Sequence, residues 1–299
     1  MKFSPVFLMI IGLYSCQQNP PADSVGHAEK ASLPVASKDN YWYQGKAEVS
    51  SYSVVQERYG EQREAGQVMV FVTEDFSATK QVKLDAEPAA GDVRVPVLKL
   101  NTIRRFKTGI YDYSLTQSVF TPVEAKDKRS LKLSTTIQDW CGHVFVQCNA
   151  GPETYKVKSF SYFESEGDRE TEVKPGLLED EIWTRIRLHP ESLVSLKTTV
   201  LPAVFYSRFR HKPLQPEQAE ITIEKNAGES TLNLVYANIP RRLSIRFETE
   251  FPHRILGWEE THEGKLLSKG TLKKTLMDDY WKHHDVASAP LRTELNPGF

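Results

Sequence analysis

The sequence has little cysteine, little net charge and no long apolar run. Its three cysteines are Cys16, Cys141 and Cys148, too few for a scaffold that depends on disulfides. The formal net charge of −1 provides no global field, which argues against nucleic acid as the main partner. No stretch approaches 18 apolar residues, so we expect no membrane-spanning helix.

Motifs of well-known catalytic sites are also missing. There is no glycine-rich phosphate loop, no Gly-x-Ser-x-Gly elbow and no His-Glu-x-x-His pair. The histidines at 253, 262, 283 and 284 have no spacing that matches a compact ligand set. The sequence therefore favours a protein that is not an enzyme, and it predicts neither a cofactor nor a metal site.

The N-terminus has the pattern of an export signal. Lys2 precedes a short apolar core, and small residues follow it, so we expect residues 1–15 to be a signal peptide. The next residues resemble the lipobox of bacterial lipoproteins, with Leu13 at −3, Ser15 at −1 and Cys16 as the new first residue. The alternatives are an ordinary cleaved signal peptide or a short buried helix.

The lipobox resemblance implies that Cys16 carries a diacylglyceryl thioether and an N-linked acyl chain such as palmitate. More than one acyl chain is needed for stable anchoring, at about 0.8 kcal/mol per buried CH₂. We expect an outer-membrane location held by lipid alone. Gln17 and Gln18 carry no acidic signal, which favours the periplasmic face over the cell surface.

Composition divides the remaining chain into a tether, a domain and a tail. Residues 16–40 lack aromatics and periodicity, so we expect a flexible lipidated tether. Residues 41–280 predict a single β-rich domain with a helical interruption at about 176–196, and residues 281–299 a polar tail. The predicted fold is a large curved antiparallel sheet or open barrel.

Periodicity carries the fold prediction. Leu243, Ile245 and Phe247 alternate with Ser244 and Arg246, the period-two pattern of a strand with one buried face. Similar runs separated by turn residues fill residues 46–173.

In the middle of the chain, the spacing of apolar residues changes from that of a strand to that of a helix. Leu178, Ile182, Arg185 and Ile186 share one helical face, with acids early and arginines late, as the helix dipole favours. Further on, residues 208–212 (RFRHK) interleave bases with aromatics. That pattern is compatible with contacts to acidic lipid or glycan, and also with a solvated strand edge.

One stretch offers a catalytic alternative. Asp139, Cys141 and His143 fall on one face of a strand, which places an acid, a nucleophile and a base in one row. Neighbours on one face lie about 7 Å apart, too far for a nucleophile–base hydrogen bond without a bulge. Val144 stands where a thioredoxin-like motif needs its second cysteine.

The same stretch also has structural interpretations. Gly142 allows a turn, which would bring Cys141 and Cys148 close enough for a disulfide. We favour a strand and turn packed on the core by Trp140 and Phe145.

Several phrases together resemble an uncharacterised family of exported lipoproteins from Bacteroidota: VTEDF (72–76), TGIYDYS (108–114), QDWCGH (138–143) and GWEET (257–261). Some members are labelled septum formation inhibitor Maf. True Maf proteins are cytoplasmic nucleotide pyrophosphatases with an N-terminal Ser-x-Ser-Pro-Arg-Arg loop. This chain has only Pro-Arg-Arg at 240–242, so its motifs do not support that label.

These patterns predict an anchored envelope lipoprotein with a non-catalytic binding or structural role. A curved sheet encloses apolar space readily, so we expect a hydrophobic ligand or an envelope protein as partner, and the membrane through the anchor alone. The analogy to periplasmic carriers of acyl chains is one of fold only. The alternative is an envelope thiol hydrolase that uses Asp139, Cys141 and His143.

Overall fold

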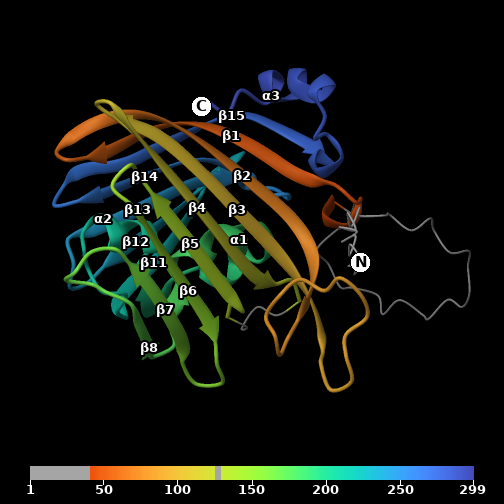
Figure 1. Cartoon of the computed structure of the whole chain (residues 1–299), viewed down its shortest axis with the longest axis horizontal. Coiled ribbons are helices and arrows are strands. Elements are labelled where there is room, and N and C mark those ends of the chain that lie inside the picture. Colours follow the sequence, from red (N-terminus) through yellow and green to blue (C-terminus); the bar gives the residue numbers. More distant parts are fainter. Residues whose placement is uncertain (1–40, 125–128) are drawn as a thin grey trace, which may run out of the picture. The chain divides into compact units, whose positions relative to one another are not determined.

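The computed structural model describes residues 41–124 and 129–299, and in these ranges the chain forms one fifteen-stranded sheet (Figure 1). The strands are β1 (Ala47–Arg58), β2 (Glu61–Ser77), β3 (Arg94–Thr108), β4 (Tyr111–Pro122), β5 (Lys132–Gln138), β6 (His143–Ala150), β7 (Tyr155–Ser161), β8 (Arg169–Val173), β9 (Leu177–Leu178), β10 (Leu196–Leu201), β11 (Glu217–Lys225), β12 (Glu229–Tyr236), β13 (Arg241–Glu248), β14 (Ile255–His262) and β15 (Lys265–Asp278).

The helices are short. They are α1 (Ile182–Leu188), α2 (Val204–Phe209) and α3 (Ala289–Leu295), with 3-10 turns η1 (Tyr41–Tyr43), η2 (Glu179–Glu181), η3 (Pro190–Leu193), η4 (Tyr280–Lys282) and η5 (Val286–Ser288). Among the described residues, no helix has the length and apolar character needed to cross a membrane.

The strand order explains how the sheet is built. Neighbours in sequence pair as hairpins from β1 to β8 and from β10 to β15, while the first and last strands, β1 and β15, pair in the middle. Only β9 and β10 run parallel. The sheet is not closed into a barrel, and the short helices interrupt it. The predicted fold is therefore confirmed.

The sheet bends around its helical interruption, so that distant strands share one core. Side chains from β2 and β3 and from β11 to β13 pack in the same cluster as Ile182 and Ile186 of α1. This is the face that the period-3.6 pattern predicts to be buried. A second cluster lies under β5 to β8 and includes Val204 of α2.

The last residues cover the other face of the sheet. Leu295 and Phe299 pack on a small cluster of β1 and β2 side chains: Ala47, Val49, Val68 and Val70. Gly66 leaves room for this contact, because a Cβ there would lie 2.3 Å from the Pro297 carbonyl oxygen. Residues 281–299, which composition sets apart as a polar tail, thus carry η5 and α3 and lie against the sheet.

Candidate functional site

The predicted acid–thiol–base row forms a hairpin turn. Residues 139–142 connect β5 to β6, and the Asp139 amide donates to the Gly142 carbonyl (3.0 Å). The Asp139 carboxylate accepts from the backbone amides of Cys141 (2.7 Å) and Gly142 (3.3 Å). In the described part of the chain, no hydrogen bond joins the Cys141 thiol to His143. The structure therefore does not assemble Asp139, Cys141 and His143 as a catalytic triad.

The two described cysteines occupy different environments. Cys141 is exposed in the turn, Cys148 is buried in β6, and both are free thiols. They are seven positions apart along mostly extended chain, a separation of about 20 Å, because a strand rises about 3.3 Å per residue. No Cys141–Cys148 disulfide is formed. Burial raises the pKa of the Cys148 thiol, with the nearby Asp180 as a second cause, so this thiol stays protonated.

The predicted packing of Trp140 is wrong. Its side chain is 68% exposed, because the chain leaves the sheet after Gln138 and the inward alternation stops there. Phe145 is only half-buried, and the β6 residues that enter the core are Val144, Val146 and Cys148. The segment is a strand and turn as expected, but the side chains of Trp140 and Phe145 do not anchor it to the core.

We expect Trp140→Ala to change the free energy of unfolding by no more than about 0.5 kcal/mol, the usual range for surface substitutions. The comparison variant is Leu133→Ala on β5, which removes a fully buried side chain and should lower the free energy of unfolding by about 2–5 kcal/mol. Urea unfolding of both variants measures the difference. A loss above about 2 kcal/mol for Trp140→Ala would contradict the exposed turn.

Acidic residues at the start of the helical interruption are buried and paired. The guanidinium of Arg241, on β13, pairs with Glu179 and also contacts Glu260 (2.7 Å). Tyr236 donates to Glu179 (2.5 Å). Burial alone would lower the pKa of Arg241, but Glu179 and Glu260 raise it well above its ordinary value. The Arg241 and Glu179 side chains are almost fully buried, so we assign this cluster a structural role.

A second buried pair joins the interruption to β1. Arg187 binds Glu48 through two hydrogen bonds of 2.6 and 2.5 Å, and neither side chain is exposed. The guanidinium lies 4.6 Å from the centre of the Phe71 ring and 4.9 Å from that of Trp42. Tyr41 also donates to Glu48. The pair therefore ties α1 to the central strands.

Asp180 positions the second helix. Its carboxylate accepts from the Val204 amide (3.0 Å) at the start of α2, and Glu179 accepts from the preceding amide of Ala203 (3.3 Å). Burial and, second to it, the neighbouring Glu179 raise the pKa of Asp180 to about 7. The buried acids thus hold α2 in the place where it forms one wall of the cavity described next.

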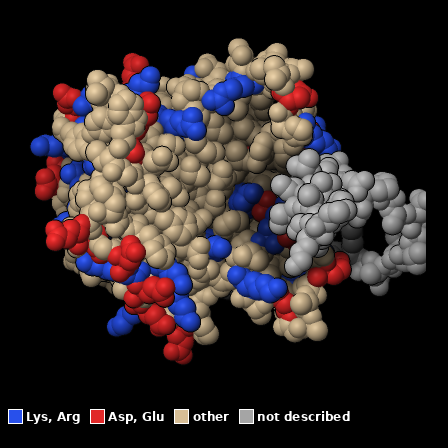
Figure 2. Space-filling view, viewed as in Figure 1, with Lys and Arg blue, Asp and Glu red and all other residues tan. Residues whose placement is uncertain are grey.

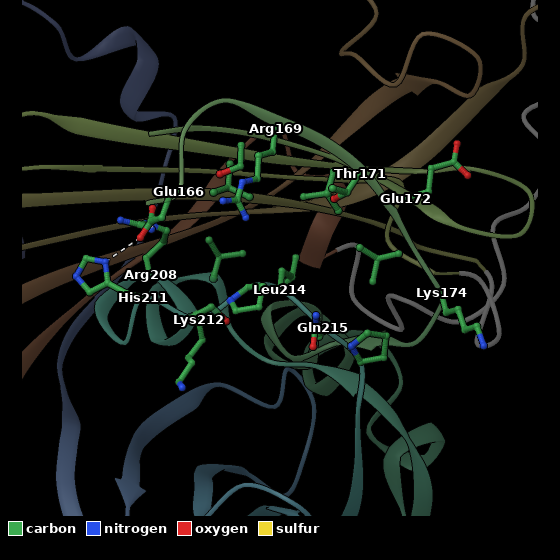
Figure 3. Close-up of a pocket in the computed structure, with 18 of the residues that line it drawn as sticks. Glu166, Arg169, Thr171, Glu172, Lys174, Arg208, His211, Lys212, Leu214 and Gln215 are labelled. Carbon is green, nitrogen blue, oxygen red and sulfur yellow. Dashed lines mark hydrogen bonds and ion pairs between the residues drawn. The ribbon is translucent and has the colours of Figure 1, made fainter. Parts of the chain in front are cut away.

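The candidate site is a cavity of about 790 Å³ where the sheet fails to close. Edge strand β8 forms one wall, and α2 with the extended segment 211–216 forms the other (Figure 3). We call this space the slot. Its apolar lining consists of Val146, Val157, Val173, Val204, Leu214, Pro213 and Pro216. Its volume is within the range of small-molecule sites.

An ion-pair latch closes one end of the slot. Glu166, in the loop before β8, accepts from His211 (2.8 Å) and pairs with Arg208 of α2 (Figure 3). Burial alone would raise the pKa of Glu166, but the hydrogen bonds from Arg208, His211 and Ser161 lower it to about 2. The latch therefore keeps its charge at neutral pH and joins the two walls.

The remaining polar rim is basic. Four basic residues line the slot (Arg169, Lys174, Arg208 and Lys212) against two acidic ones (Glu166 and Glu172). The difference is two positive charges, on a chain whose total is −1. Figure 2 shows both signs of charge at the margins of the face in view and a broad uncharged area between them. Apolar walls with a basic rim suit a ligand with an apolar body and an anionic group.

Sequence reasoning pointed to only part of this site. The basic and aromatic segment 208–212 supplies Arg208, His211 and Lys212, which an acidic-ligand interpretation of that segment singles out. The valines of the slot come from β6, β7, β8 and α2, where they look like any inward-facing residues. No local signal distinguishes a core valine from one that borders a cavity.

The search for relatives gave no family. No family model, curated protein or solved structure matches this chain. The predicted signal peptide, Cys16 and the tether lie outside the described residues. One group in the described ranges could hold a metal ion, Asp278, Asp279 and His283, and it is partly exposed.

Proposed function

We propose that this chain is an outer-membrane lipoprotein that binds an anionic amphiphile, such as a fatty acid, in the slot, without catalysis. The observation that carries the proposal is the opening between β8 and the segment 211–216, lined by valine and leucine and rimmed by lysine and arginine. The apolar wall takes the acyl chain, and the rim takes the acidic group. Cys16 supplies the anchor, on the periplasmic face.

The geometry of the slot supports ligand binding rather than catalysis. The walls are held rigidly, by the Glu166 latch at one end and by Asp180 at the start of α2. The slot lining also includes serines, His211, Glu166 and Glu172, but His211 bonds to Glu166, and among the described residues no hydrogen bond joins it to a serine. Burial raises the pKa of the Cys148 thiol, which disfavours it as a nucleophile. We therefore expect Cys141→Ser to leave ligand binding unchanged.

The test measures binding of a fluorescent long-chain fatty acid by the purified protein. Thr171, on β8, lines the slot, and Thr171→Trp fills it, so we expect at least about a tenfold loss of affinity, or about 1.4 kcal/mol. Glu170→Trp is the matched control, because Glu170 is the preceding β8 residue and does not line the slot. Equal affinities for the two variants, or no binding by the parent protein, would contradict the proposal.

The rim and the anchor are tested separately. Lys174→Ala combined with Lys212→Ala should weaken binding of the fatty acid but not of the matching fatty alcohol, since only the acid carries a charge. Cys16→Ala should release the protein from the membrane fraction. Retention of that variant in the membrane would refute the anchor and leave the slot untouched.

A further inference from the structure

Exposed apolar side chains gather at one end of the sheet. Because neighbouring strands are antiparallel, the end where β1 begins also holds the β2–β3 loop, the β13–β14 turn and the chain after β15. That end carries Tyr43, Val93, Phe251, Tyr280, Trp281 and Val286, all of them exposed. They come from four separate segments, so the sequence gives no sign that they share one surface.

Ring contacts hold part of this surface in place. Tyr280 and Trp281 pack edge to face at 5.4 Å, and Tyr41 packs in the same way on Phe251 at 5.6 Å. Tyrosine and tryptophan combine an apolar ring with a polar group, which suits them to the interface between bilayer and water. An exposed set of such residues marks a contact surface with membrane or protein.

The place where the predicted tether joins selects the membrane. The tether, residues 17–40, enters the described chain at η1, at this same end of the sheet. A coil of its length has an end-to-end distance of about 27 Å, whereas β1 alone spans about 40 Å to the opposite end. A protein anchored at Cys16 therefore meets the bilayer first with the η1 end.

We propose that this end of the sheet lies on the bilayer to which Cys16 is anchored, as a second contact beside the lipid. The inference rests on the proposed anchor and not on the slot ligand. Two acidic groups next to Trp281 are paired, Asp278 with His283 (2.8 Å) and Asp279 with Lys282 (2.8 Å). Because aromatic side chains make the contact, we expect this end to bind neutral lipid, and we expect salt to change that binding little.

Two exposed tryptophans at opposite ends provide the test. Trp281 follows β15 at the η1 end, and Trp140 lies at the other end in the β5–β6 turn. The full lipidated chain is reconstituted in phosphatidylcholine vesicles whose acyl chains carry bromine near the headgroup, and tryptophan quenching is measured. We expect Trp281→Phe to remove most of the quenching and Trp140→Phe to leave it unchanged.

Either of two results overturns the inference: no quenching in the parent protein, or quenching lost with Trp140→Phe and kept with Trp281→Phe. Flotation with the vesicles is recorded first. Protein that floats with the vesicles but shows no quenching is anchored without the second contact. Protein that does not float has neither the anchor nor the second contact.

Glutamate substitutions provide a second measurement. Val93 is 61% exposed and Val286 is 93% exposed, both at the η1 end, and a charge at either should push this end out of the interface. We expect Val93→Glu with Val286→Glu to reduce the Trp281 quenching at unchanged melting temperature. Ile110→Glu, at an 85% exposed position of the opposite end, is the control and should have no effect.

Discussion

Replacing Arg241 with methionine should lower the free energy of unfolding by about 3–5 kcal/mol, the cost of breaking a buried ion pair on one side. Arg241 is fully buried, and its removal leaves the carboxylates of Glu179 and Glu260 without their cation. Glu179 also accepts from the Ala203 amide before α2, so the variant should loosen one wall of the slot.

Arg242→Met is the matched control, since Arg242 is the next β13 residue and its side chain is exposed on the opposite face. It should change stability by no more than about 0.5 kcal/mol. Urea unfolding at neutral pH compares the two variants with the parent. Equal stability of both would mean that the cluster around Arg241 is hydrated and makes no net contribution.

Replacing Asp180 with asparagine should have the opposite sign and stabilise the protein at neutral and basic pH. The pKa of Asp180 is about 7 in the folded chain, against about 3.9 for an unfolded aspartate. Between these two values the unfolded state gives up a proton that the folded state keeps, so stability falls as pH rises. Asparagine cannot ionise, and its side-chain oxygen can still accept from the Val204 amide.

The expected gain is up to about 4 kcal/mol above pH 7, at about 1.4 kcal/mol per pKa unit, and it should vanish below about pH 4. Urea unfolding at about pH 5 and about pH 8 measures it. The control is Asp112→Asn, which removes an exposed carboxylate of β4 and should change little at either pH. An asparagine variant less stable than the parent at pH 8 would show that the ionised carboxylate is needed.

Period and turn chemistry made the fold predictable. The alternation at Leu243, Ile245 and Phe247 is the burial pattern of β13, and the helical face of Ile182 and Ile186 is buried in α1. These patterns need only local chain geometry and one buried face, so they can be read without any partner.

Features that depend on distant partners could not be read in this way. Glu179, Asp180 and Glu181 look like a solvated acidic helix start, but their environment is set by Arg241, Val204 and Ser130. The segment after Ile137 was expected to pack Trp140 on the core, but the Asp139 turn ends the strand and leaves that side chain exposed. The slot forms where edge strand β8 faces α2 and the segment 211–216 without pairing with them, which no local pattern indicates.

The pairing of β1 with β15 also determines the order in which the sheet can form. Ser51 pairs with Val68 through a short hairpin, but on its other side it pairs with Lys274, more than 200 residues away in sequence. β1 is largely buried on both faces, so until β15 is available the chain presents a long, bare strand edge. The central strand is therefore among the first to be synthesised and the last to be completed. Folding should be slow and open to misassembly at that edge.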